Sequence, residues 1–231
     1  MHFGHSPALW QAFPELVAGT LQVQGIHDRV DVGGALTRHV ERAQARLQGG
    51  TESDLPPIQA WRRAFARMGL KPTQYRCASE ALLRRLRKEG DLPRLHPLVD
   101  LCNAVSVAFA IPVAALDLQR IDGDLQVRHA TGSEDYLAFS GEHEHPEPGE
   151  VTFADDAGRA HARRWTNRQS ALSAIQPASA DVLIVAEALH DGAAADVRAL
   201  VDTLVHELRT LWGVPVRSAL LSPDAPRFEC A

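Results

Sequence analysis

The chain has 231 residues, of which 45% are hydrophobic and 23% are charged. These proportions are typical of folded proteins and exclude a wholly disordered chain. No uninterrupted apolar stretch approaches the ~18 residues of a membrane-spanning helix, and the first residues lack the basic and apolar segments of a signal peptide. The three cysteines are scattered and form no CxxC pair. We therefore expect a cytoplasmic protein with no membrane partner.

The net charge of −5 is unevenly distributed along the chain. Residues 60–96 contain ten Lys or Arg residues and three acids, a local balance of +7, whereas the remainder carries 14 basic and 26 acidic residues. Such a segment fits either a nucleic-acid-binding face or a solvated helix surface. Charge alone does not decide between the two.

The first half of the chain predicts one strand followed by helices. Residues 16–26 are β-branched and partly alternating, which is typical of an opening strand. Helices are expected at 35–47, which is rich in Ala, Arg and Gln, and at 58–68 and 79–88, where apolar residues recur on one face. Residues 97–110 are almost all small and apolar, so this helix should be the buried one.

Short strands dominate the middle of the chain. An Asp-Gly turn predicts paired strands at 118–121 and 125–130. Residues 142–149 are polar and Pro-rich, so we expect an exposed loop there. A second hairpin is predicted from 151–154 and 160–165, which the turn residues DDAG separate.

The last third predicts a central strand at 181–187 and an amphipathic helix at 194–211. The chain shows no internal repeat and no composition break that would divide it. We therefore expect one domain over residues 1–231. Its fold class is α+β (mixed α/β), with a central mixed or antiparallel sheet flanked by helices.

Several familiar sites are excluded by their motifs. The chain has no P-loop, no GxGxxG and no GxSxG. His206-Glu207 begins like a zinc helix, but Thr210 replaces the second histidine of HExxH. His143 and His145 alternate with acids and could bind a divalent metal, although a solvated loop explains them better. We expect no metal and no cofactor.

A polar stripe interrupts the buried helix at 97–110. Asp100, Asn103 and Ser106 lie three residues apart and therefore fall along one side. Buried polar groups need partners, because an unsatisfied one costs ~1–3 kcal/mol. The stripe either holds neighbouring backbone in place or lines a polar pocket.

Arginines supply two further candidate sites. Arg128 ends a predicted strand, where it could clamp a carboxylate or phosphate, or pair with Asp117 or Glu134. After the second hairpin, an arginine-rich cluster surrounds Trp165. Arginine beside tryptophan suits base stacking and phosphate contact, but it also suits a packed strand end with solvated charges. The members of this cluster are Arg163, Arg164, Trp165, Asn167, Arg168 and Gln169.

An ordered set of short motifs carries a family resemblance over residues 94–168. These motifs are Val99-Asp100, Asn103, Pro112, Leu116-Asp117, Arg128, Ala130, Gly132, Glu134 and Ala154-Asp155. In this order they resemble the editing module, the B3/B4 domain, of the phenylalanyl-tRNA synthetase β subunit. Trp61-Arg62, Ser79-Glu80, Pro148-Gly149 and Asn167-Arg168 also look like the free-standing branch of that family.

The resemblance implies hydrolysis of the ester between a wrong amino acid and the terminal ribose of a tRNA. The synthetase removes tyrosine from a phenylalanine tRNA. It commonly has a pocket histidine two residues after the Pro of its bend, whereas this chain has Ala114. Its Gly-Gly-Glu segment has no clear equivalent either, so tyrosine specificity is not carried over.

By this resemblance we predict a trans-acting aminoacyl-tRNA deacylase whose partner is tRNA. The expected catalytic residues are Asn103, Asn167 and Arg168, and the expected substrate-binding residues are Asp100, Ser106, Arg128 and Glu134. The basic helical segment 58–96 would hold the RNA backbone. The expected RNA-binding residues are Arg62, Arg63, Arg84, Arg85, Arg87, Lys88 and Arg164. The alternatives are a non-catalytic module that binds RNA or an amino acid, and a hydrolase of small amino-acid esters or amides.

Overall fold

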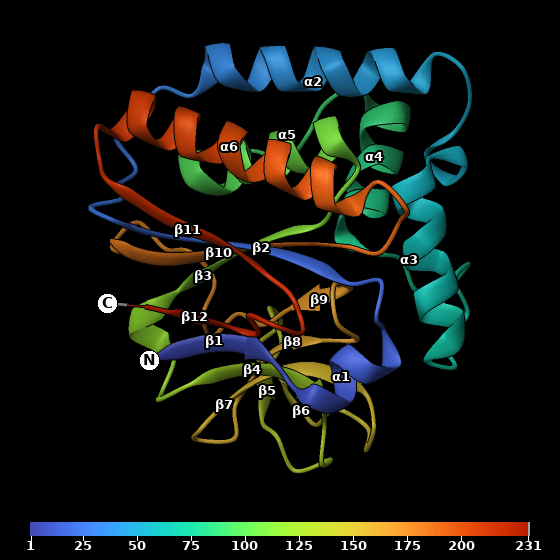
Figure 1. Cartoon of the computed structure of the whole chain (residues 1–231). Helices are drawn as coiled ribbons and strands as arrows, with labels where there is room; N and C mark the ends of the chain where they lie inside the picture. The colour runs from blue at the N-terminus through green and yellow to red at the C-terminus, as the bar shows by residue number, and fades with distance from the viewer. Residues whose placement is uncertain (231) are drawn as a thin grey trace.

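Three layers make up the molecule: a group of helices, a four-stranded sheet beneath them, and a six-stranded sheet on the far side (Figure 1). The computed structural model describes residues 1–230. The expected mixed α+β class, with sheets flanked by helices, is confirmed.

The four-stranded sheet is antiparallel throughout, in the order β11-β2-β10-β3. Its strands are β2 (Val17–Gln24), β3 (Val113–Asp117), β10 (Asp181–Ala188) and β11 (Val216–Leu221). The apolar run of β10 predicts a central strand, and β10 pairs with both β2 and β3. That expectation is confirmed.

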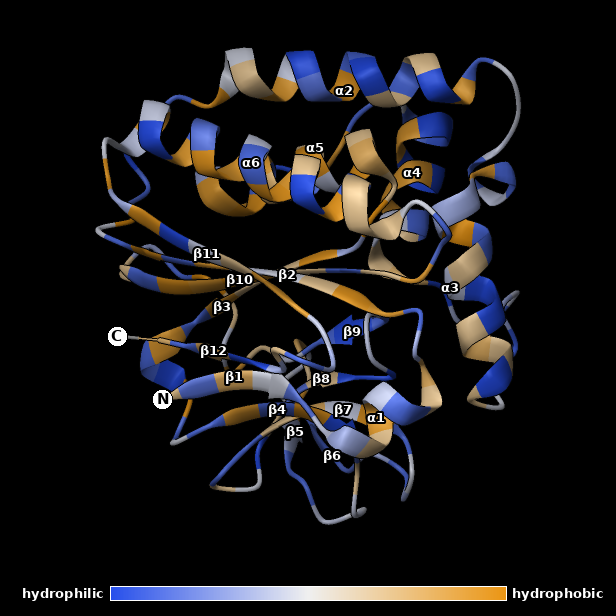
Figure 2. Ribbon diagram, viewed as in Figure 1, coloured by the Kyte–Doolittle hydropathy of each residue, from blue (hydrophilic) through white to orange (hydrophobic). Residues whose placement is uncertain are grey.

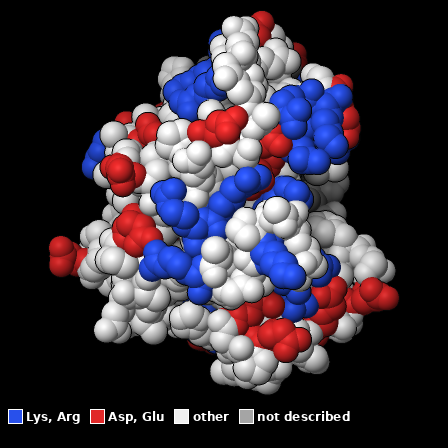
Figure 3. All heavy atoms as spheres, turned by 90° about the vertical axis from the view of Figure 1, so that its right-hand side faces the viewer, with Lys and Arg blue, Asp and Glu red and all other residues white. Residues whose placement is uncertain are grey.

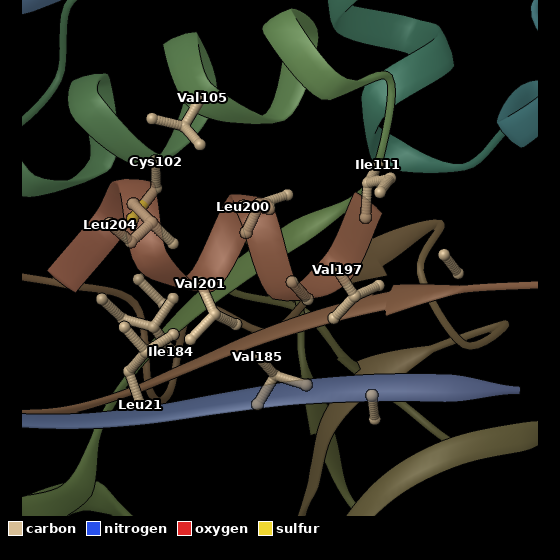
Figure 4. Close-up of a cluster of buried hydrophobic side chains, with 14 of the residues drawn as sticks. Leu21, Cys102, Val105, Ile111, Ile184, Val185, Val197, Leu200, Val201 and Leu204 are labelled. Atoms are coloured by element: carbon tan, nitrogen blue, oxygen red, sulfur yellow. The ribbon is translucent and has the colours of Figure 1, made fainter. Parts of the chain in front are cut away.

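Helices lie on one side of this sheet (Figure 1). They are α2 (Gly33–Leu47), α3 (Pro56–Arg67), α4 (Ala78–Glu89), α5 (Pro97–Phe109) and α6 (Ala193–Trp212), with the short η1 (Glu52–Asp54) between α2 and α3. Of these, α5 and α6 pack on the face of the sheet, α2 lies outside them, and α3 and α4 lie at one end (Figure 2). The core between α5, α6 and the sheet includes Cys102, Leu204 and Ile184 (Figure 4). Burial raises the pKa of the Cys102 thiol to about 12, so it is a neutral core group. Within residues 1–230, no helix is both long and apolar enough to span a bilayer.

The six-stranded sheet is mixed, in the order β12-β1-β4-β7-β8-β9, with β1 and β4 parallel. Its strands are β1 (His2–His5), β4 (Leu125–His129), β7 (Val151–Asp155), β8 (Ala160–Arg163), β9 (Arg168–Gln169) and β12 (Arg227–Glu229). The helix α1 (Pro7–Ala12) follows β1, and β5 (Tyr136–Leu137) pairs with β6 (His143–Glu144) in a separate small sheet.

Two expectations about local structure are wrong. Residues 118–121 are not a strand: η2 (Leu118–Arg120) forms there because Asp117 Oδ1 accepts a hydrogen bond from the Gln119 amide at 3.0 Å. Residues 142–149 are not entirely an irregular loop, because they contain β6. Two arginines of the six-stranded sheet hold Glu144 of β6 inward. Local composition reveals neither the Asp117–Gln119 hydrogen bond nor the arginine contacts of Glu144.

The outer edge of β3 is covered by the end of β9 and the segment that follows it. Gln169 Nε2 donates to the Ala115 carbonyl at 2.8 Å, and the Asp117 amide donates to the Ser173 carbonyl at 2.9 Å. These bonds join the last strand of one sheet to the chain leaving the other. The segment therefore also fixes the rim of the space between the two sheets.

Candidate functional site

A cavity of about 70 Å³ lies between the edges of the two sheets, and we call it the inter-sheet cavity. Residues from β3 and β10 meet residues from β7, β8 and β9 around it. Its apolar wall includes Pro112, Ala114, Leu116, Phe153, Trp165 and Val185, and its polar wall includes His161, Thr166, Asn167, Arg168, Gln169 and Glu187. A mostly apolar pocket with a few convergent polar groups is the usual form of a ligand site.

A strained turn between β8 and β9 presents the polar rim. Arg164 and Trp165 both have positive φ, 48° and 59°, which costs non-glycine residues about 1–3 kcal/mol each. The Trp165 ring holds the turn: it is buried, and its Nε1 donates to Glu187 Oε1 at 2.9 Å. Its ring also meets the edges of Phe13 and Trp61. Burial of this ring thus sets the direction of Asn167 and Arg168.

Asn167 and Arg168, both expected in the site, do line the inter-sheet cavity. Asn167 Nδ2 donates to the Arg76 carbonyl at 2.7 Å, while its Oδ1 has no hydrogen bond within residues 1–230. Arg168 binds Glu144 through two hydrogen bonds, of 2.9 and 3.0 Å, and lies over the Tyr136 ring. Asn167 therefore has a spare acceptor, whereas the guanidinium of Arg168 is already held by the protein.

A buried histidine–aspartate pair lines the same cavity. His161 is fully buried, and its Nε2 lies 3.1 Å from Asp155 Oδ2. Burial alone would raise the pKa of Asp155, but hydrogen bonds from His161, Arg159 and the Asp122 amide bring it far below its usual range. Asp155 is thus an ionised carboxylate. His161 Nδ1 has no partner within residues 1–230.

Asn103 lines a different opening, a groove of about 310 Å³ that we call the side groove. It shares Val113 and Gln169 with the inter-sheet cavity, so the two openings are neighbours. Leu95 and Phe139, which are 73% and 72% exposed, also line it. The structure therefore places Asn103 beside Asn167 and Arg168, but on the other side of the β3 edge.

Four other expected residues lie outside the inter-sheet cavity. Asp100 accepts a hydrogen bond from the Leu95 amide at 2.8 Å, and the Ser106 hydroxyl donates to the Ile111 carbonyl at 2.6 Å. Both bonds hold the ends of α5 to the adjoining chain. The role of Asp100 and Ser106 in substrate binding stays a prediction.

Arg128 and Glu134 form a partly buried pair at 2.5 Å. Burial opposes ionisation of Glu134, but hydrogen bonds from Thr131, Arg128 and Gly132 lower its pKa to about 2. The pair closes the turn after β4, away from the cavity. Their contact with substrate also stays a prediction.

Lysine and arginine side chains gather on the face that contains α3 and α4 (Figure 3). Many of them are already paired: Arg62 with buried Glu80, and Arg84 and Arg87 with buried Glu52. Exposed Arg85 pairs with Glu89, and Arg164 lies over the Tyr75 ring. The cations of residues 60–96 for which the described structure gives no ion pair are Arg63, Lys71, Lys88 and Arg94.

Within residues 1–230, no three His, Cys, Asp or Glu side chains are grouped as a metal site. His143 pairs instead with Asp135 at 2.7 Å, and His145 Nδ1 contacts the Glu134 carbonyl at 2.8 Å. Both histidines therefore contact the chain just before β5, in the small β5–β6 sheet region.

The inter-sheet cavity lies in a part of the chain that matches a known protein family. Residues 60–200, more than half of the chain, match the B3/4 domain. The chain belongs to the B3/4 domain family. The inter-sheet cavity of this B3/4 domain, including Ala114, Phe153, His161 and Asn167, lies within the matched residues.

The relatives of this B3/4 domain include phenylalanine–tRNA ligase beta subunits. Those of Shewanella oneidensis and Cereibacter sphaeroides are 36% and 34% identical over 73 residues, which is 32% of this chain. The match spans only 9% of the length of each relative. A crystal structure of an N-terminal fragment of the phenylalanyl-tRNA synthetase beta subunit from Pyrococcus horikoshii aligns with 93% of this chain and 50% of its own, at 10% identity and a TM-score of 0.48.

Sequence reasoning missed His161 and Glu187 as cavity residues. The signal for His161 was available: a predicted hairpin from 151–154 to 160–165 brings Asp155 and His161 close across the turn. Glu187 was placed in a central apolar strand, where a buried acid needs a partner. Its partner, His5, is 182 residues away in the sequence, so no local pattern could identify it.

Proposed function

We propose that this B3/4 domain hydrolyses, in trans, the ester between a wrongly attached amino acid and the terminal ribose of a tRNA. The observation that carries the proposal is the inter-sheet cavity, which lies within the family match and has an apolar wall beside a polar rim. Similarity to phenylalanine–tRNA ligase beta subunits supports tRNA as the partner. The proposed reaction uses water as its nucleophile and needs neither metal nor cofactor.

The size of the cavity favours an amino acid with a short side chain. The volume is about 70 Å³. A cavity that binds benzene has about 150 Å³, and one water occupies about 30 Å³ of liquid. The cavity thus has about half the volume of one that holds an aromatic ring, which favours a side chain smaller than that of phenylalanine or tyrosine.

The rim residues would orient the ester. Asn167 Oδ1 is free to accept a hydrogen bond from the attacking water or from the amino group of the substrate, because only Nδ2 is committed to the protein. Arg168 is held by Glu144, so its remaining N–H groups would be available at the cavity mouth in a fixed geometry. Fixed dipoles and charges of this kind stabilise developing charge at little reorganisation cost.

The side groove and the basic face would hold the RNA. Exposed Phe139 offers a ring on which a terminal base can stack, and Asn103 offers a carboxamide for its edge. Backbone phosphates would contact the four cations that have no ion pair in the described structure, all of which are exposed: Arg63, Lys71, Lys88 and Arg94. Phosphate contacts of this kind weaken steeply as salt rises.

The decisive test is deacylation of a panel of correctly and wrongly charged tRNAs. We expect selective hydrolysis by the wild type and a loss of about 10²-fold in Asn167→Ala, the size of effect seen when one group that binds the transition state is removed. Gln44→Ala is the matched control, since Gln44 is an exposed amide on α2. A wild type that hydrolyses no member of the panel refutes the proposal.

A second candidate function is a non-catalytic module that binds RNA or an amino acid. The favouring observation is the cavity wall itself: Ala114 stands where the synthetases commonly have a pocket histidine, and Arg168 is neutralised by Glu144. Absence of hydrolysis across the panel, with tRNA still bound in a gel-shift titration, would support this function instead.

A further inference from the structure

The buried pair Asp155–His161 lies in the wall of the inter-sheet cavity. His161 lines the inter-sheet cavity, and only one of its two ring nitrogens has a partner. Asp155 is held independently by Arg159, whose Nε donates to Oδ2 at 2.8 Å. The aspartate therefore stays in place without the histidine, and the second ring nitrogen of His161 is left without a role in the fold.

The ionised state of Asp155 fixes the tautomer of His161. A carboxylate without a proton can only accept hydrogen bonds, so the hydrogen of the His161–Asp155 contact belongs to His161 Nε2. In a neutral imidazole, Nδ1 then carries the lone pair. In that state His161 is an oriented hydrogen-bond acceptor in the wall of the inter-sheet cavity. Its ring is fully buried, so a small movement of the cavity wall must expose Nδ1 before a water can reach it.

We propose that His161 is the general base of this domain and that Asp155 is its positioning residue; the proposal rests on the function proposed above. Nδ1 takes one proton from a water as the water oxygen bonds to the ester carbonyl carbon. The carbonyl electron pair moves to its oxygen and then returns, breaking the bond to the ribose oxygen. That ribose oxygen receives the proton from Nδ1, so the free amino acid and the ribose hydroxyl leave with all atoms balanced.

Asp155 would have the role of the aspartate in a Ser-His-Asp triad. It holds the imidazole in one tautomer and stabilises the imidazolium that forms during the reaction. The nearby charged groups are Arg159 on the same hairpin, Glu187 on β10 and Arg168 on β9. Thr166, whose hydroxyl has no partner within the described residues, provides a second polar group for the water.

The test compares single-turnover deacylation and tRNA affinity in His161→Gln. A glutamine amide can still donate to Asp155 but offers no ring nitrogen at the Nδ1 position, so a purely structural role would survive this change. We expect the hydrolytic rate to fall about 10²–10⁴-fold, the usual contribution of a general base, while the Kd for tRNA and the Tm stay near wild type. The control is His206→Gln, an exposed histidine on α6.

Asp155→Asn provides an independent second variant. Its amide would donate to Nε2 and move the imidazole hydrogen to Nδ1, so the rate should again fall with tRNA affinity preserved. A His161→Gln variant that keeps its rate within threefold overturns the general-base assignment while leaving the proposed function standing. A wild type without any deacylation overturns both. If His161→Gln fails to fold, a folded Asp155→Asn variant with wild-type rate overturns the assignment by itself.

Discussion

The contact between His5 of β1 and Glu187 of β10 is expected to be one of the larger single contributions to stability. His5 Nε2 lies 2.6 Å from Glu187 Oε1, and both side chains are almost completely buried. Trp165 Nε1 donates to the same oxygen at 2.9 Å. Substitution His5→Phe keeps the approximate volume but leaves the acid with Trp165 as its one side-chain partner among residues 1–230.

Removing one partner from a buried pair costs about 3–5 kcal/mol, because the remaining group stays desolvated. For a domain of this size, about 2–4 °C of Tm is lost per kcal/mol, so His5→Phe should lower the Tm by roughly 6–20 °C. Replacing both partners, in His5→Phe/Glu187→Leu, removes the unpaired group and should restore most of the loss.

Urea unfolding followed by tryptophan fluorescence measures these differences, since Trp61 and Trp165 both contact Glu187. The two single variants and the double variant complete a thermodynamic cycle. The reasoning would be refuted if His5→Phe lowered the free energy of unfolding by less than about 1 kcal/mol. It would also be refuted if the double variant lost as much as the two single variants together. Thr37→Val, at an exposed position on α2, controls for unrelated surface effects.

Three further predictions follow from described contacts. Because the pKa of Glu134 is lowered from 4.5 to about 2, its contribution, on the order of 3 kcal/mol, is present above about pH 5 and lost as the pH falls toward 2. The free energy of unfolding, measured with urea at pH 6 and pH 2, should therefore change less between the two pH values in Glu134→Gln than in the wild type. Ala114→Leu fills the inter-sheet cavity and should reduce deacylation of the preferred substrate at least tenfold in the panel assay, whereas an unchanged rate would place the substrate elsewhere. Arg63→Ala and Lys88→Ala should each lower the slope of log Kd against log salt for tRNA by about one, and Arg85→Ala, whose charge is paired with Glu89, should change it less.

The sequence predicted most of the fold because its long elements carry strong periodic signals. The helices α2 to α6 and the strands β2, β4 and β10 lie close to their expected positions. The strands β1, β11 and β12 were not predicted, since they are defined by partners far along the chain. Strand β3 was not predicted either, because alanine-rich residues after a helix give no clear strand signal.

The candidate site was predictable only where its residues are neighbours in sequence. Asn167 and Arg168 follow one strained turn and reach the same cavity. Spacing on α5 correctly placed Asp100 and Ser106 on one helix, but it could not reveal that their hydrogen bonds go to the adjoining chain. Periodicity gives the direction of a side chain and not the identity of its partner.

The segment that covers the outer edge of β3 has a second consequence for the whole molecule. An open strand at the end of a sheet offers unpaired amides and carbonyls to any other chain. Here Gln169 and Ser173 occupy that edge, so the rim of the cavity also protects the sheet from pairing with a second copy. Sequence changes at this rim would therefore also change solubility, and Gln169→Ala should aggregate sooner on heating than the wild type.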